Sequence, residues 1–162
     1  MNFIIKELKS VNNPNSVHGI YPYRGKISAL DAEKILSQMP TGSVVLDPFC
    51  GSGTIVYEGL RFGHKTIGID ANPIAVALSK GKISIPVNID DVNNELELYI
   101  KKCTCREYDG EIPEYPKSLF HEKSINQIMN MAQFYEEMSD YLKACFLGAI
   151  ALTARGCNDY KW

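Results

Sequence analysis

The feature that most constrains the fold is a glycine turn between an apolar run and a helical pattern. Val44-Val45-Leu46 is a short apolar run that ends at Asp47, which is typical of a buried parallel strand. Gly51-Ser52-Gly53 turns the chain, and Thr54 to Phe62 then carries apolar residues at helical spacing. A strand, a glycine turn and a helix in this order predict an α/β fold with a parallel sheet.

The same pattern continues with a second strand and helix. Thr66 to Ile69 is predicted to be a strand that ends at Asp70, and Asn72-Pro73 opens a helix towards Lys82 with proline in its first turn. Upstream, Ser28-Ala-Leu-Asp31 resembles a capping box, which predicts a helix through Met39. Together these elements correspond to the first half of a doubly wound α/β sheet.

After Asp91 the chain is predicted to be helical to its end. The expected helices run from Asp90 or Asp91 through Ile100, from Glu122 to Tyr135 and from Ser139 to Ala154, with an exposed loop at Tyr108 to Pro116. Phe3 to Ile5 and Ile83 to Val87 are weak strand candidates. So small a sheet leaves an apolar strand edge open. We therefore expect an incomplete Rossmann-like domain with extra helices after the second strand, completed by a C-terminal half in cis or in trans.

We divide the chain into three segments of one domain. Residues 1–28 form an N-terminal segment, residues 29–90 hold the strands and the glycine turn, and residues 91–162 are helical. With 162 residues, 45% of them hydrophobic, the chain has enough apolar material for a core. A net charge of −2 gives no overall basic excess, so either a basic surface is local or another segment or subunit grips any nucleic acid.

Cysteine usage and the absence of long apolar runs indicate a cytoplasmic protein. The five cysteines are odd in number and fit no disulfide framework. The start of the chain is too mixed for a signal peptide, and no apolar run approaches the ~18 residues of a membrane span. Cys103 and Cys105 have no histidine or cysteine pair at zinc spacing beside them, so we predict no metal site.

The glycine turn and the two acids predict a ligand site. Glycines let a ligand approach the backbone, and the amino end of a helix offers free N–H donors. Asp47 suits a ligand ammonium group, and Asp70, about 20 residues past the turn, suits both hydroxyls of a ribose. Val56 occupies the third glycine position, so this is not the dinucleotide fingerprint. A tight structural turn, and a helix cap made by Asp70 or Asn72, remain alternative interpretations.

Asp47-Pro48-Phe49-Cys50-Gly51-Ser52-Gly53-Thr54 closely resembles the cofactor motif of S-adenosylmethionine-dependent DNA amino-methyltransferases, which methylate adenine N6 or cytosine N4. Asn72 to Lys80 resembles the helix after their ribose-binding acid. Tyr21 to Lys26 is similar to their amino-terminal His-Pro-Tyr-Pro-Ala-Lys motif, which Pro22, Tyr23 and Lys26 match, whereas Tyr21 and Arg24 depart from it. Weaker likeness extends to Phe120-His121 and to Ala151 to Arg155.

This resemblance implies a class I methyltransferase fold with S-adenosylmethionine as cofactor and DNA as substrate, in a restriction-modification or similar context. It implies that Asp70 binds the ribose, that Ala71 and Asn72 border the adenine, and that Tyr23 to Lys26 close over the methionine carboxylate, where Lys26 or Arg24 pairs with it. The cofactor-binding residues that it implies are Tyr23, Arg24, Lys26, Asp47, Phe49, Cys50, Gly51, Gly53, Thr54, Asp70, Ala71 and Asn72.

The sequence lacks the family's catalytic motif, (Asp/Asn/Ser)-Pro-Pro-(Tyr/Phe/Trp), because it contains no Pro-Pro dipeptide. That motif holds the amino group of a flipped base. We therefore assign no catalytic residue and expect this chain alone to be inactive. DNA is expected to be bound as substrate through a C-terminal half or a partner subunit. Copies of the chain can also associate into a homo-oligomer. Two alternatives stay open: a fragment of an RNA guanine-N2 methyltransferase, and a non-catalytic cofactor-binding or interaction module.

Overall fold

The two predicted strands form one parallel pair. The computed structural model describes residues 17–105 and 107–154, in which β1 (Val44–Asp47) and β2 (Lys65–Gly68) pair with Leu46 opposite Ile67. Parallel strands need a crossover, which is α2 (Thr54–Arg61). The described part of the chain holds no third strand. The weak strand candidate Ile83 to Val87 is wrong, because Ile83 ends α3 and Pro86 cannot donate to a ladder; Phe3 to Ile5 lies outside the described residues.

Two helices cover one face of this pair. α2 packs directly on it, and the contact is so close that a Cβ added at Gly59 would lie 2.4 Å from Cγ2 of Thr66. α1 (Ala29–Leu36) packs on α2 and buries Leu36 almost completely. The predicted cap of α1 is confirmed, since Ser28 Oγ accepts a hydrogen bond from the Asp31 amide at 3.1 Å.

A third helix, α3 (Pro73–Ile83), joins the strand unit to the rest of the protein. Asn72 caps it by accepting from the Ile74 amide at 3.0 Å, so the cap predicted for Asp70 or Asn72 falls to Asn72. α3 packs against α7 (Asp140–Thr153) through fully buried small residues. Gly81 allows this approach, because a Cβ there would lie 2.3 Å from that of Ala144.

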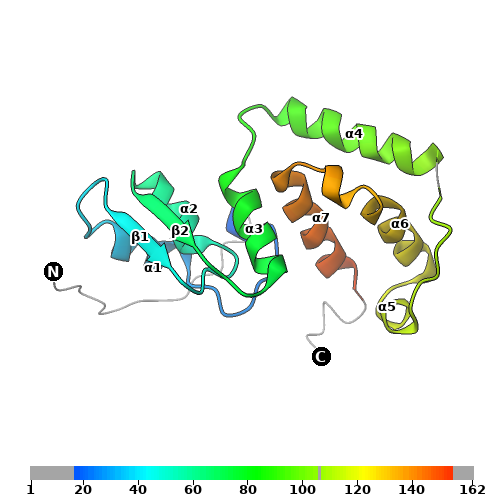
Figure 1. Ribbon diagram of the computed structural model, residues 1–162, viewed down its shortest axis with the longest axis horizontal. Helices are drawn as coiled ribbons and strands as arrows, with labels where there is room; N and C mark the ends of the chain where they lie inside the picture. The colour runs from blue at the N-terminus through cyan, green and yellow to red at the C-terminus, as the bar shows by residue number, and fades with distance from the viewer. Residues whose placement is uncertain (1–16, 106, 155–162) are drawn as a thin grey trace.

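The remaining helices form a separate layer beyond α3. In Figure 1 the strands, α1 and α2 lie on one side of α3, and α4 to α7 lie on the other. The layer comprises α4 (Ile89–Cys105), α5 (Glu114–Leu119), α6 (Glu122–Ala132), the 3₁₀ turn η2 (Tyr135–Glu137) and α7; a further 3₁₀ turn, η1 (Val17–Gly19), precedes α1. Its core consists of Tyr99, Met138 and Leu142, with Met131, Phe134 and Phe146 packed against them.

Two boundaries in this layer differ from the sequence-based expectations. The loop expected at Tyr108 to Pro116 ends early, because α5 begins at Glu114 and accommodates Pro116 in its first turn. The helix expected from Glu122 to Tyr135 stops at Ala132, where Phe134 turns to place its ring 6.1 Å from that of Tyr99. A contact distant in sequence therefore ends a helix that local spacing alone would continue.

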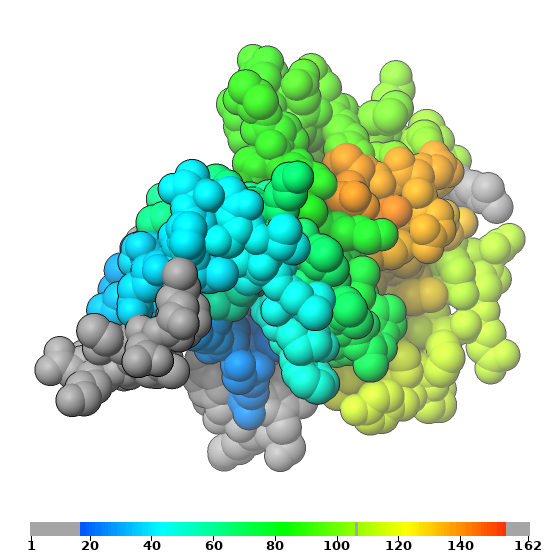
Figure 2. Space-filling view, turned by 60° about the vertical axis from the view of Figure 1, so that its left-hand side comes forward, coloured from blue at the N-terminus to red at the C-terminus, as the bar shows by residue number. Residues whose placement is uncertain are grey.

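No described helix or strand covers the second face of the strand pair. Because side chains alternate along a strand, Val44 and Leu46 of β1 share this face with Ile67 and Ile69 at β2, and they are 63%, 58%, 51% and 54% exposed. We call these residues the open face. The buried strand expected at Val44 to Leu46 is thus wrong for this face of β1. Figure 2 shows the cyan segment around β1 at the front of the molecule, with no later helix over it in that view.

None of the helices in residues 17–105 and 107–154 is long and apolar enough to cross a membrane.

Candidate functional site

The glycine turn lies between the end of β1 and the start of α2. Gly51 and Gly53 both have positive φ, at 51° and 75°, a conformation that strongly favours glycine. A Cβ at Gly53 would lie 2.6 Å from Ser79 Oγ, so α3 fills the space behind it. Gly53 precedes α2 without a side-chain cap. The first amides of α2 therefore remain available to a ligand, and the helix dipole favours a negative group there.

Asp70 is joined to this turn by its carboxylate. One oxygen accepts from the Gly51 amide and the other from the Asn72 amide, each at 2.8 Å. These bonds, first that to Asn72 and then that to Gly51, lower the pKa of Asp70 below its ordinary value. A carboxylate has about four acceptor positions, so two stay free for ligand hydroxyls. The structure thus brings together the turn and the acid, which lie in separate parts of the sequence.

Asp47 and the residues around it form the rim of the site. The Asp47 carboxylate accepts from the Phe49 amide at 3.2 Å, which keeps it beside the turn. Phe49 is 87% exposed, and Ala71 and Asn72 are exposed as well. An exposed phenyl ring beside a glycine turn offers an apolar surface to a ligand or to another chain.

The N-terminal motif also reaches the turn. A Cβ at Gly51 would lie 3.1 Å from a ring atom of Tyr23, so the tyrosine ring lies directly against the glycine. Tyr23 and Asn72, together with Tyr21, Pro22 and Arg24, line a cavity of about 400 Å³. Residues from two separate sequence motifs therefore meet around one hollow that is open to solvent.

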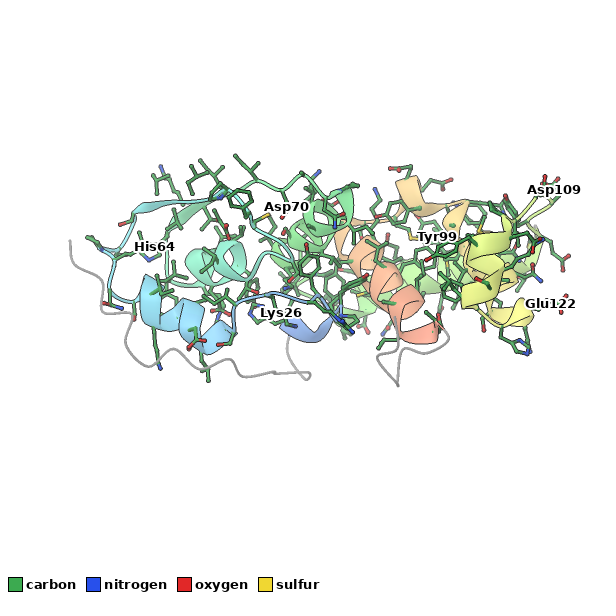
Figure 3. All side chains as sticks on the ribbon, turned by 90° about the horizontal axis from the view of Figure 1, so that it is seen from below. Lys26, His64, Asp70, Tyr99, Asp109 and Glu122 are labelled. Carbon is green, nitrogen blue, oxygen red and sulfur yellow. The ribbon has the colours of Figure 1, made fainter. Side chains whose placement is uncertain are left out.

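Lys26 points away from this cavity. Its ammonium donates to the backbone carbonyl of His18 at 2.6 Å, and burial lowers its pKa. Figure 3 shows Lys26 on the opposite side of the molecule from Asp70 in that view. In the present arrangement Lys26 is therefore a structural contact of the N-terminal segment.

Cys50 and Thr54 have buried side chains, 7% and 3% exposed as residues. Burial raises the pKa of the Cys50 thiol, and its sulfur lies 3.6 Å from Ser79 Oγ. Thr54 Oγ1 has no hydrogen-bond partner among the residues that the structure describes. These two positions can therefore meet a ligand through their backbone rather than through their side chains.

Sequence reasoning missed the side of α3 that holds the turn. Ser79 Oγ donates to the Gly51 carbonyl at 2.9 Å, and the Lys82 ammonium donates to Ser52 Oγ at 3.1 Å. Lys82 and Ser52 are both only 2% exposed. Positions i and i+3 lie on the same face of a helix, so the spacing of Ser79 and Lys82 could have indicated a shared contact.

A second buried network lies behind the first. The carboxylate of Glu58, a residue only 1% exposed, accepts from His18 Nε2 and from Arg61, each at 2.7 Å. Burial is the largest influence on His18 and lowers its pKa, so the ring is neutral at neutral pH. The negative charge of Glu58 raises the pKa of Arg61. Within residues 17–105 and 107–154, no group of three or more His, Cys, Asp or Glu side chains is placed to hold a metal ion.

Burial makes Lys82 an energetic cost to the fold at neutral pH. Desolvation, followed by repulsion from Lys26, lowers its pKa from 10.5 to about 8, whereas Glu58 acts in the opposite direction. Below pH 8 both the folded and the unfolded chain hold this proton, and the full burial cost is present. Between pH 8 and 10.5 the folded chain releases the proton first, so stability rises with pH across that window.

We predict that Lys82→Met makes the protein more stable at pH 7 by about 1–3 kcal/mol. The pKa depression sets the upper limit, and loss of the hydrogen bond to Ser52 reduces the gain. The advantage over the wild type should shrink towards pH 10. Urea denaturation at pH 7 and 10 measures both values, with the exposed Lys80→Met on the same helix as control. A gain that is equal for both variants, or independent of pH, would contradict the assignment of a buried charge.

Comparison with known proteins places the chain among methyltransferases. Residues 10–81 match the model of a family of N6/N4 methyltransferases, which is described as DNA methylase. The chain is 37% identical over 68 residues to Type II methyltransferase M.MjaII of Methanocaldococcus jannaschii, covering 41% of this chain and 13% of that protein. It is 31% identical over 127 residues to Type II methyltransferase M.MvaI of Kocuria varians, covering 71% of this chain and 28% of that protein.

A third relative carries a different name. The probable tRNA (guanine(10)-N2)-dimethyltransferase of Methanothermococcus thermolithotrophicus is 26% identical over 115 residues, covering 67% of this chain and 68% of that protein. No solved structure matches the chain. The chain spans less than a third of the length of each of the two Type II methyltransferases. The match of the glycine-turn region to the family model, together with these two relatives, identifies the chain as a member of the amino-methyltransferase family of DNA methylases.

Proposed function

We propose that this chain is the S-adenosylmethionine-binding part of a DNA methyltransferase that acts on an exocyclic amine, adenine N6 or cytosine N4. The observation that carries the proposal is the bond between the Gly51 amide and Asp70. It joins a turn suited to the amino-acid part of the cofactor to an acid suited to the ribose. Tyr23 and Asn72 line the adjoining open hollow, where the adenosine lies in this proposal.

The site residues take distinct roles in this proposal. The amides at the start of α2 receive the methionine carboxylate, Asp47 faces the ammonium, and Asp70 accepts the ribose hydroxyls. Ala71 and Asn72 border the adenine, and Phe49 lies over the methionine part. Cys50, Gly51, Gly53 and Thr54 contribute backbone. Arg24 stays a candidate partner of the carboxylate, whereas Lys26 takes part only if it leaves the His18 carbonyl.

Methyl transfer requires groups that this chain does not carry. The sequence has no Pro-Pro dipeptide, so the motif that holds the target amine is supplied by another segment or by a partner subunit. The open face, and the edge of β1 that pairs with no other described strand, support this view, because a doubly wound sheet carries further strands and helices there. A restriction-modification context and a cytoplasmic location belong to the same proposal.

Calorimetry with S-adenosylhomocysteine tests the cofactor assignment. We predict binding to the wild-type chain and a loss of about tenfold to a hundredfold in Asp70→Ala, the range for losing a hydrogen bond to a charged group. Asp91→Ala is the matched control, because Asp91 is an exposed aspartate on α4. Tight binding of NAD with no binding of S-adenosylhomocysteine would show that the cofactor assignment is wrong.

RNA is the second candidate substrate. The observation in its favour is the likeness to the probable tRNA (guanine(10)-N2)-dimethyltransferase over 67% of this chain. Relatives named for different nucleic acids share this segment, and a methyl donor is common to both reactions. That pattern supports a cofactor-binding role more directly than it supports either substrate. Labelled methyl transfer to DNA and to tRNA by the completed enzyme would separate the two, and cofactor binding with no transfer would favour a non-catalytic module.

A further inference from the structure

The glycine turn is held from the side of α3 by a buried lysine. Lys82 reaches Ser52 Oγ at 3.1 Å, and Ser79, one helical turn earlier, reaches the Gly51 carbonyl at 2.9 Å. Ser52 lies between the two glycines of positive φ. A displacement of Ser52 would therefore move both neighbouring peptides and, with them, the amides at the start of α2.

The charges around Lys82 do not neutralise it by contact. The side chains whose charges act on its ammonium are Lys26 and Glu58, and burial is the larger influence. Both oxygens of Glu58 already accept from His18 and Arg61. Among the described residues, Ser52 is the hydrogen-bond partner that the structure gives Lys82. A buried charge without a contacting counter-ion is costly, and a methionine of similar length would fill the space at lower cost.

We propose that Lys82 is a positioning residue for the cofactor: its ammonium, bonded to Ser52 between α3 and the glycine turn, holds the turn and places positive charge behind it, so that the start of α2 accepts the cofactor carboxylate. The inference rests on the proposed function of the same site. In this view the apoprotein bears an uncompensated positive charge, which the arriving carboxylate offsets through the turn.

The inference predicts opposite effects of pH on stability and on cofactor affinity. Loss of the Lys82 proton above pH 8 relieves the fold of a buried charge. The same loss weakens the bond to Ser52 and removes the positive charge that the carboxylate meets. Cofactor affinity should therefore fall where the stability contributed by Lys82 rises. A residue that serves packing alone would show no such opposition.

The test measures dissociation constants of the full chain for two ligands from pH 6.5 to 9.5. S-adenosylhomocysteine carries the amino-acid part, whereas methylthioadenosine lacks both its carboxylate and its ammonium. We expect S-adenosylhomocysteine to bind about 3–10-fold more weakly at pH 9.5, which corresponds to a rise of about half to one unit in the Lys82 pKa on binding. Methylthioadenosine should bind with nearly constant affinity.

Two variants separate the lysine from other titrating groups. Lys82→Arg keeps the charge at all these pH values and should bind S-adenosylhomocysteine without the loss above pH 8, while any titration of the ligand itself persists. Lys82→Met should bind it weakly throughout, with methylthioadenosine little affected. Where a variant fails to fold, the wild type still tests the inference, because an affinity for S-adenosylhomocysteine that does not fall above pH 8 would overturn it.

The outcomes distinguish this inference from the proposed function. Binding of S-adenosylhomocysteine at pH 6.5 that stays constant to pH 9.5 would overturn the role of Lys82 and leave the cofactor site intact. The same decline in Lys82→Met as in the wild type would also overturn it. Failure of the wild type to bind S-adenosylhomocysteine at pH 6.5 would overturn both the site and the inference.

Discussion

Replacing Glu58 by alanine is expected to lower the free energy of unfolding by about 2–3 kcal/mol, because it leaves the buried His18 imidazole without its charged hydrogen-bond acceptor. The Glu58 carboxylate accepts from His18 Nε2 and from Arg61, each at 2.7 Å. Its removal leaves the buried imidazole without this acceptor and Lys82 without the nearby negative charge that favours its protonated form. Glu58→Gln preserves the shape and should lose about half as much, since an amide can still accept one hydrogen bond.

Glu33 offers a matched control for this experiment. It contacts the same Arg61 side chain, at 3.3 Å, but the side chains of Glu33 and Arg61 are 35% and 53% exposed. Exposed ion pairs contribute little, so Glu33→Gln should change stability by less than about 0.5 kcal/mol. Urea denaturation followed by far-ultraviolet circular dichroism measures all three variants. Equal effects of Glu33→Gln and Glu58→Ala would show that the network around Glu58 is not a buried anchor of the fold.

The elements that sequence predicted correctly are those with local signals. The cap at Ser28 and the turn at Gly51 and Gly53 depend on residues within a few positions of one another. The same holds for α3, whose start is marked by Asn72 followed by proline. Hydrogen bonds between a side chain and the next turn, and the requirement for positive φ, leave a signature in any short stretch of sequence.

What sequence could not predict depends on contacts between distant residues. Lys82 lies in the last turn of α3, where a lysine is usually exposed to solvent. Its burial follows only from the packing of α3 behind the turn, 30 residues earlier in the chain. The contact between His18 and Glu58, which are 40 residues apart, could not be predicted from sequence for the same reason. The sequence motifs thus indicated which residues line the site, but not which buried side chains keep those residues in place.

The strand run shows a second kind of limit. Val44-Val45-Leu46 has the composition of a strand covered on both sides, and that composition is consistent with a larger sheet. Among the described residues only one face is covered, because α2 packs on that face and the other helices pack on α2, on α3 and on one another. The apolar composition of β1 therefore indicates that both of its faces are suited to burial, whereas the structure shows which face the described helices cover.

The open face leads to the last prediction, which concerns association. Burying the half-exposed side chains Val44, Leu46, Ile67 and Ile69 would contribute roughly 1 kcal/mol for each, and Phe49, 87% exposed, would add about 2 kcal/mol. A polypeptide that carries the Pro-Pro motif and the remaining strands should bind there and also pair with the free edge of β1. At 100 times its dissociation constant it would stabilise the chain by about 2.7 kcal/mol, a rise of roughly 5–10 °C in melting temperature.

The partner can be taken from the coding sequence next to this one or from M.MvaI, of which the match covers 28%. Leu46→Glu places a charge on the open face and should abolish the rise in melting temperature, while costing the chain alone little because Leu46 is already 58% exposed. Leu98→Glu, at a position 51% exposed on α4, is the matched control and should leave the rise unchanged. Without the partner, sedimentation should show self-association that Leu46→Glu suppresses, since the same apolar surface then meets a second copy. A monomer whose melting temperature ignores the partner would mean that the open face is not a docking surface, and that the methyltransferase site is completed from some other side of the molecule.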